Sequence, residues 1–181
     1  AVPVWALADG ASDRAHEQFA QVISRATGDE AVFSPRVGRL IGWPTTEMRQ
    51  LNDAEKLDLL IDAHWAWSQT INPEEATFTG FAGQNGRWTD LSEANRARTE
   101  ELERAFLQAL NGIDPGNISS AERLNLALLR HQMEHDVAGQ RFPDELMPVN
   151  QMFGVQVWVA SVLGAQPLFN EVDRENFIQR L

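Results

Sequence analysis

The chain has 181 residues, of which 43% are hydrophobic and 23% charged, and its formal net charge is −11 at pH 7. Such a length suits one compact domain, since a domain of roughly 150 residues already buries about 70% of the surface exposed by its unfolded chain. The negative charge disfavours nucleic-acid binding, and no run approaches the ~18 consecutive apolar residues of a membrane span. We therefore expect a single domain over residues 1–181, with no nucleic-acid partner and no membrane span.

The first half of the chain predicts two helices. Over residues 12–26 the apolar side chains recur at steps of three and four, which is the period of a helix packed on one face. Residues 28–48 contain two Pro, three Gly and no periodic pattern, so we expect a loop there. Asn52 and Glu55 fit a capping box, and the apolar pattern that follows predicts a helix over residues 52–71.

The middle of the chain predicts a loop and then a helix. Residues 77–91 are rich in Gly, Thr and aromatic side chains, which favours a loop or a short hairpin pinned by Phe81 and Trp88. The helical pattern over residues 92–110 stops at Asn111-Gly112, where Gly tolerates a left-handed backbone.

Three more helices are expected in the last third. Ser119 and Glu122 form a second capping box, which opens a helix to about residue 138. Residues 148–164 are strongly apolar and read as a buried helix, although a strand also fits part of the pattern. A helix over residues 170–181 presents an apolar face and then stops without a cap, as an interrupted helix would. The fold expected is all-α, a multi-helix array with long irregular connections.

One short pattern is typical of metal chemistry. His131, Glu134 and His135 match H-x-x-E-H, which in inverted zinc proteases supplies two ligands and a general base. A catalytic zinc site needs at least three protein ligands, and this chain has no cysteine and four histidines. The other two, His16 and His64, lie on separate predicted helices without a spacing that indicates convergence.

The simpler interpretation is that His131 and His135 are packing residues and bind no metal. Their face of the helix continues through Leu124 and Leu128, so they extend an apolar stripe that should be packed. We therefore predict no catalytic residue and no metal ligand in this chain. The alternative is a zinc site at His131 and His135 with Glu134 as the base.

Other candidate groups also have structural interpretations. The adjacent carboxylates Glu74-Glu75 and Glu100-Glu101 would point about 100° apart on a helix, so we expect solvated faces rather than acid and base pairs. Trp65 and Trp67 beside His64 are suited to a ligand cleft, but core packing is the favoured interpretation.

Several segments over residues 57–181 resemble, in order and spacing, a bacterial family known as domain of unknown function 885. They are "WAWSQTINPEEATFTGF", "WTDLSEANRARTEELERAFLQALNGID", "LNLALLRHQMEHDV", and "MPVNQMFGVQ" leading to "FNEVDRENFIQRL". Members are usually longer, often exported or lipid-anchored, and similar to helical zinc metallopeptidases. Their zinc helix stands in the C-terminal half, and nothing equivalent occurs here, since His16-Glu17 is the chain's lone His-Glu pair.

The resemblance implies the noncatalytic N-terminal portion of an exported, peptidase-like hydrolase, walling the substrate cleft and completing the core of a C-terminal half. The partner would be that half or a second copy, with zinc in the full-length parent and no cofactor in this chain. The opening "AVPVWALADGAS", without initiator Met, is typical of a secreted protein after signal cleavage or of a trimmed chain, and we expect an exported protein. Two alternatives remain, a self-sufficient helical binding or scaffold domain and a small zinc protease using the histidine motif.

Overall fold

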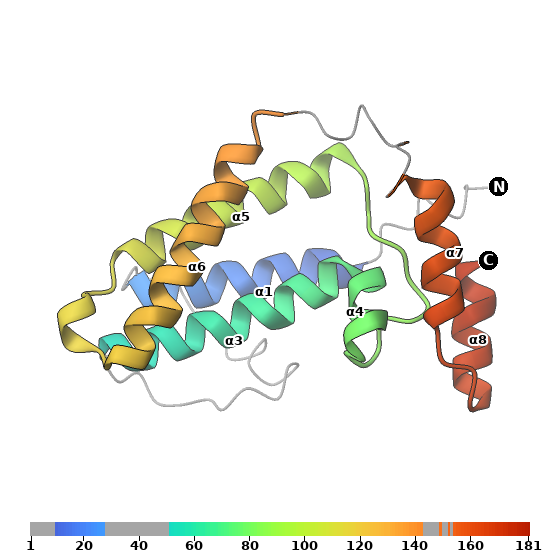
Figure 1. Ribbon diagram of the computed structural model, residues 1–181, viewed down its shortest axis with the longest axis horizontal. Coiled ribbons are helices and arrows are strands. Elements are labelled where there is room, and N and C mark those ends of the chain that lie inside the picture. The colour runs from blue at the N-terminus through green and yellow to red at the C-terminus, as the bar shows by residue number, and fades with distance from the viewer. Residues whose placement is uncertain (1–9, 28–50, 143–148, 150–151, 153) are drawn as a thin grey trace.

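The computed structural model describes residues 10–27, 51–142, 149, 152 and 154–181, so the loop expected at residues 28–48 lies outside the described residues. All regular structure in this part of the chain is helical, without a strand (Figure 1). The helices are α1 (Gly10–Thr27), α3 (Asp53–Ile71), α4 (Pro73–Thr79), α5 (Glu93–Asn111), α6 (Ser120–Gly139), α7 (Val155–Ala165) and α8 (Glu171–Arg180), with a 3-10 turn at Pro115–Asn117. The all-α prediction is confirmed.

The predicted helix starts are confirmed by their caps. Asn52 and Glu55 form a reciprocal capping box at α3, with hydrogen bonds of 2.9 and 3.0 Å. Ser119 and Glu122 form the same arrangement at α6. These bonds satisfy backbone N–H groups that have no partner within the first helical turn. At the other end of α5 the helix stops at Asn111 as expected, but Gly112 has φ −76°, so no left-handed residue is needed there.

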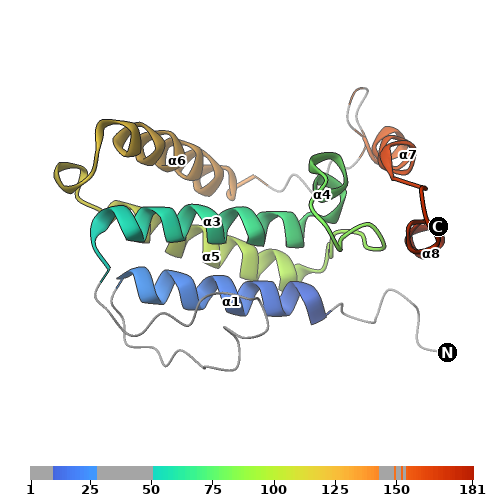
Figure 2. The same cartoon turned by 90° about the horizontal axis from the view of Figure 1, so that it is seen from below.

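A hydrophobic core holds α1, α3, α5 and α6 together. α1 packs against both α3 and α5, and α6 packs against α5 (Figure 2). The side chains of Phe19, Leu57, Leu60, Phe106 and Leu110 are almost completely buried there. They come from three helices that are separated in sequence, so the core fixes the relative positions of these helices.

The remaining helices lie beside the end of this bundle (Figure 1). α4 follows α3 directly and ends at Gly80, whose φ of 75° is the left-handed conformation that glycine adopts readily. The chain then runs to Ser92 as a connection without a strand, so the hairpin alternative is wrong. The loop predicted for residues 77–91 is found from residue 80 on, whereas residues 77–79 belong to α4, a helix that was not predicted. Trp88 pins this segment as expected, because its Nε1–H donates to the Arg180 carbonyl at 2.9 Å.

The apolar segment near the C-terminus is a helix, but it is not the buried helix predicted for residues 148–164. α7 packs on α4 with one side, and most of its side chains remain on the surface. Val162 is fully buried, whereas Val155 and Trp158 are 53% and 39% exposed. A helix that is apolar all round needs neighbours on every side to be buried, and the described residues supply them on one side. No described helix has the length and apolar character required to cross a membrane.

Candidate functional site

A buried arginine ties the C-terminal helix to the segment that follows α3. The Arg180 side chain at the end of α8 is 4% exposed. Its five guanidinium N–H groups donate hydrogen bonds of 2.8–3.2 Å to five oxygen atoms, which are the carbonyls of Pro73, Gln84 and Arg87 and the side-chain oxygens of Thr77 and Gln166. Burial lowers the pKa of Arg180, and the nearby carboxylate of Glu74 counteracts this. Arg180 therefore joins α8, the end of α7 and residues 73–87.

Glu74 is buried beside this arginine, which corrects the prediction of a solvated face. Its two carboxylate oxygens accept hydrogen bonds from Thr89, at 3.0 Å from the backbone N–H and 2.5 Å from the hydroxyl. The side chain is buried because the segment around Thr89 folds back over the first turn of α4. The neighbouring Glu75 is exposed, as predicted.

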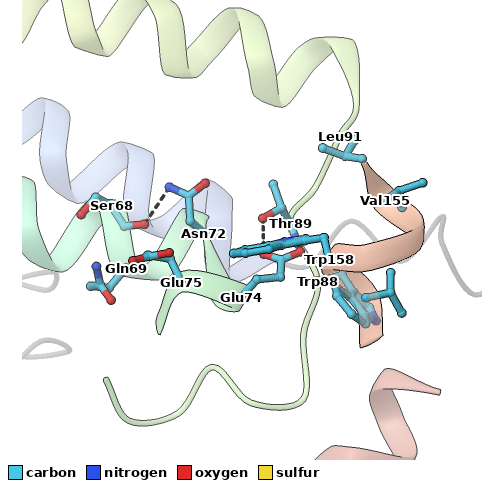
Figure 3. Close-up of a pocket in the computed structure, with 11 residues that line it drawn as sticks. Ser68, Gln69, Asn72, Glu74, Glu75, Trp88, Thr89, Leu91, Val155 and Trp158 are labelled. Atoms are coloured by element: carbon cyan, nitrogen blue, oxygen red, sulfur yellow. Dashed lines mark hydrogen bonds between the residues drawn. The ribbon is translucent and has the colours of Figure 1, made fainter. Parts of the chain in front are cut away.

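An open cleft of about 700 Å³ lies between the end of α3, α4, the segment around Thr89 and α7 (Figure 3). One set of lining residues is polar, namely Ser68, Gln69, Asn72, Glu74, Glu75 and Thr89. The other set is apolar, namely Trp88, Leu91, Val155, Trp158 and Val159. Apolar walls with a few polar groups in a volume of roughly 300–1,000 Å³ are typical of ligand sites.

The chain brings this cleft together from residues far apart in sequence. Trp88 is fixed by its bond to the backbone of Arg180, and Trp158 packs against Phe78 of α4 with ring centroids 5.3 Å apart. Gln166, at the end of α7, donates to the carbonyl of Asn85 at 2.8 Å. We call Arg180 and the five oxygen atoms that accept its hydrogen bonds the Arg180 cluster. This cluster and the contacts of α7 position the two aromatic walls of the cleft, Trp88 and Trp158.

The histidine motif of α6 is exposed, so its interpretation as a packed pair is wrong. His131, Glu134 and His135 all lie on the surface, and Leu128 on the same face is 61% exposed. α6 buries the opposite face, through residues such as Met133. Among the described residues no group of three or more His, Cys, Asp or Glu side chains is placed to hold a metal ion.

Exposure of these histidines sets the expected effect of replacing them. Because neither ring is packed, the double variant His131→Gln/His135→Gln should change the free energy of unfolding by less than about 0.5 kcal/mol, as is usual for surface positions. Urea denaturation of the variant and the parent chain measures this. A loss above about 1 kcal/mol would show that the pair contributes packing after all.

The other two histidines converge on one tryptophan, which the sequence did not indicate. The ring centroids of His16 and His64 lie 6.0 and 5.7 Å from that of Trp67. Trp67 Nε1–H donates to His16 Nδ1 at 3.1 Å, and His16 Nε2 lies 2.7 Å from Asn95 Oδ1. Since Nδ1 accepts, the proton of this imidazole is on Nε2. Core packing is confirmed for Trp67, which is 4% exposed, but is wrong for Trp65, which is 51% exposed.

His64 makes the stability of this core depend on pH. Its ring stacks on Phe106 with centroids 4.7 Å apart, and burial lowers its pKa to about 4, with a smaller opposing effect from Asp136. An unfolded histidine titrates near 6.5, so the unfolded chain binds the proton first. The stabilisation from neutral His64 is complete above about pH 6.5 and is lost as the pH falls towards 4.

The expected loss between pH 7.5 and 4.5 is about 2 kcal/mol for this group. Urea denaturation of the parent chain and of His64→Phe at both pH values measures it, because the variant keeps the stacked ring and removes the titrating nitrogen. Other titrating groups, including Glu103 whose pKa burial raises, contribute equally to both proteins. An identical pH dependence in the two proteins would contradict this role of His64.

The comparison with known proteins places most of this site within one family. Residues 73–181 match the family described as bacterial protein of unknown function (DUF885), which is more than half of the chain. The chain belongs to the DUF885 family. No curated protein and no solved structure matches it. The DUF885 segment begins at the first residue of α4, so it contains the Arg180 cluster, Glu74 and both aromatic walls of the cleft.

Proposed function

We propose that this DUF885 chain is the noncatalytic N-terminal helical portion of an exported, peptidase-like hydrolase. In this role it forms one wall of the substrate cleft and completes the core of the C-terminal portion of the same protein. The observation that supports the proposal is the open cleft between α3, α4 and α7, which lies largely in the family segment. Zinc, where the full-length parent uses it, would be held outside this chain.

The lining of the cleft suits a peptide. Trp88 and Trp158 offer flat apolar surfaces for side chains, and Ser68 and Asn72 bring a hydroxyl and an amide to the same cavity (Figure 3). Ser68 Oγ donates to the Trp65 carbonyl and Asn72 Nδ2 to the Ser68 carbonyl, so these side chains offer their oxygens as acceptors. Peptides present both apolar side chains and backbone N–H and C=O groups, so they need this mixture of partners. The polar groups of the Arg180 cluster are hydrogen-bonded to one another and serve to position the walls.

Peptide binding without hydrolysis tests the proposal. Short apolar peptides should bind with a dissociation constant measurable by calorimetry, and Trp158→Ala should weaken binding by about 5- to 20-fold because it removes an aromatic wall. Phe169→Ala is the matched control, since Phe169 is 91% exposed and does not line the cleft. Mass spectrometry of the same mixtures, with added zinc, should show intact peptide.

Two results would contradict this role. Equal binding by Trp158→Ala and the parent chain would place the peptide elsewhere. Hydrolysis that a chelator abolishes, and that His131→Gln/His135→Gln also abolishes, would instead establish the small zinc protease with Glu134 as its base. Elemental analysis distinguishes these cases further, since our proposal expects no stoichiometric zinc in the purified chain.

A self-sufficient binding or scaffold domain is the second candidate, and the exposed apolar side chains favour some partner in either case. They gather on and around the last two helices, as Val155, Val157, Trp158, Leu168, Phe169, Val172, Ile178 and Leu181. Apolar patches of this kind mark interaction surfaces. Sedimentation over a range of concentrations distinguishes the two candidates. A chain whose apolar surface is normally covered by a partner should self-associate, whereas a self-sufficient domain should remain monomeric.

A further inference from the structure

The charges of the cleft indicate which peptides it would take. Glu74 and Glu75 both line it, and none of its described lining residues is Lys, Arg or His. Glu74 is 8% exposed and its two oxygens already accept hydrogen bonds from Thr89, whereas Glu75 is exposed. Low-dielectric walls strengthen the field of such carboxylates, so the cavity attracts cations and repels anions.

The indole of Trp158 adds a second preference for positive charge, whereas the ring of Trp88 already has the Arg180 guanidinium 5.4 Å from its centroid. Trp158 is 39% exposed and packs on one side against Phe78, so part of its ring remains accessible. Tryptophan is the ring that binds cations best, through its negative face. Lys and Arg side chains also carry long methylene stems, which match the apolar surface of Leu91 and Val159.

The nearby arginine does not cancel this charge. Arg180 weakens the negative potential around Glu74, but all five of its N–H groups are held by protein oxygens. Arg180 is not a lining residue of the cleft. Its guanidinium lies 5.4 Å from the ring centroid of Trp88, at one aromatic wall. A ligand at the other wall therefore meets the exposed carboxylate of Glu75, while Glu74 is buried and hydrogen-bonded to Thr89.

We propose that the cleft selects peptide segments in which a lysine or arginine side chain stands between apolar residues. The cation lies against the Glu75 carboxylate and the indole of Trp158, and the flanking apolar side chains pack on the remaining walls. This inference rests on the proposed function, since it names the class of peptide that the substrate cleft would accept.

Capped tripeptides test the selection without a free amino terminus. In acetyl-Leu-X-Leu-amide, X is Lys, Arg, norleucine or Glu, and calorimetry at low salt measures each affinity. We expect Lys and Arg to bind about 5- to 10-fold tighter than norleucine, which has a similar stem without the charge, and Glu to bind most weakly. The variant Glu75→Gln should weaken the binding of the Lys peptide more than that of the norleucine peptide and so remove most of the advantage of Lys. Glu134→Gln, an exposed carboxylate outside the cleft, is the matched control.

The possible failures separate the two proposals. Equal affinities for Lys and norleucine, or tightest binding by the Glu peptide, would overturn the preference for cations and leave a peptide cleft. An unchanged Lys advantage in Glu75→Gln would place the recognition elsewhere and so also overturn it. Absence of binding by every peptide, including norleucine, would overturn the proposed function itself.

Discussion

Replacement of Arg180 by alanine should lower the free energy of unfolding by about 3–5 kcal/mol, which is among the largest effects that a single change can have in this chain. The variant removes the donor of the Arg87 carbonyl and of the Gln166 side-chain oxygen. The carbonyls of Pro73 and Gln84 also lose a hydrogen bond, but each keeps a second donor, Thr77 Oγ1 and the Arg87 N–H. Buried polar groups without a partner cost about 1–3 kcal/mol each, although water entering the gap would satisfy some of them. Urea denaturation measures the total loss.

Hydrogen exchange should show where Arg180→Ala acts. Amides of α8 and of the segment around Trp88 should lose protection first, since Arg180 joins these elements, whereas the α3 and α5 amides should be affected less. Arg174→Ala is the matched control, because Arg174 is an exposed arginine of the same helix. A stability within about 0.5 kcal/mol of that control would mean that the Arg180 cluster does not hold α8.

Phe106→Ala should destabilise the bundle by a similar amount, about 3–5 kcal/mol, because it leaves a cavity where a fully buried ring was. The ring of Phe106 contacts both Phe19 of α1 and His64 of α3, with centroids 5.2 and 4.7 Å away. One side chain of α5 therefore contacts two other helices. Thermal and urea unfolding measure the loss.

The control for this prediction is Phe142→Ala. Phe142 is 57% exposed beyond the end of α6, so its truncation should change the stability by less than about 1 kcal/mol. Equal losses for Phe106→Ala and Phe142→Ala would mean that the core of the bundle does not lie around Phe106. A Phe106→Leu variant, which keeps much of the volume, should recover more than half of the loss.

Local patterns made the longer helices of this chain predictable, although the short α4 was not predicted. Asn52 with Glu55 and Ser119 with Glu122 are neighbours in sequence, and the hydrogen bonds they form depend on one helical turn. The apolar period of residues 12–26 likewise reports one face of one helix, and α1 buries that face. Such features are decided within a few residues, so the sequence contains most of the information that determines them.

The candidate site was missed because its contacts join distant residues. Glu74 is buried by a segment 15 residues later, and Arg180 reaches back to Pro73 across 107 residues. The sequence around Glu74-Glu75 does not indicate that one of the two carboxylates is buried, so a solvated face was expected. The sequence around Arg180 does not indicate burial of its side chain either. The capping pattern places α8, but not the side chain that α8 buries.

Burial was also overestimated where a face of a helix has no neighbour. The stripe of Leu124 and Leu128 on α6 has the pattern of a packed face, yet both side chains are more than half exposed. Apolar periodicity shows that a face is suited to packing, but it does not identify the partner. The same reason explains why α7 is apolar all round and still exposed on most of its surface.

Peptide binding in the cleft between α3, α4 and α7 is tested most directly by the indole N–H signals of the tryptophans in an NMR spectrum. Adding acetyl-Leu-Lys-Leu-amide to ¹⁵N-labelled protein should shift the signals of Trp88 and Trp158, which line the cleft. The signals of Trp65, exposed on α3, and of Trp67, buried in the core, should remain in place. Shifts at Trp65 or Trp67 without shifts at the cleft tryptophans, or no shifts at all at saturating peptide, would contradict peptide binding in this cleft.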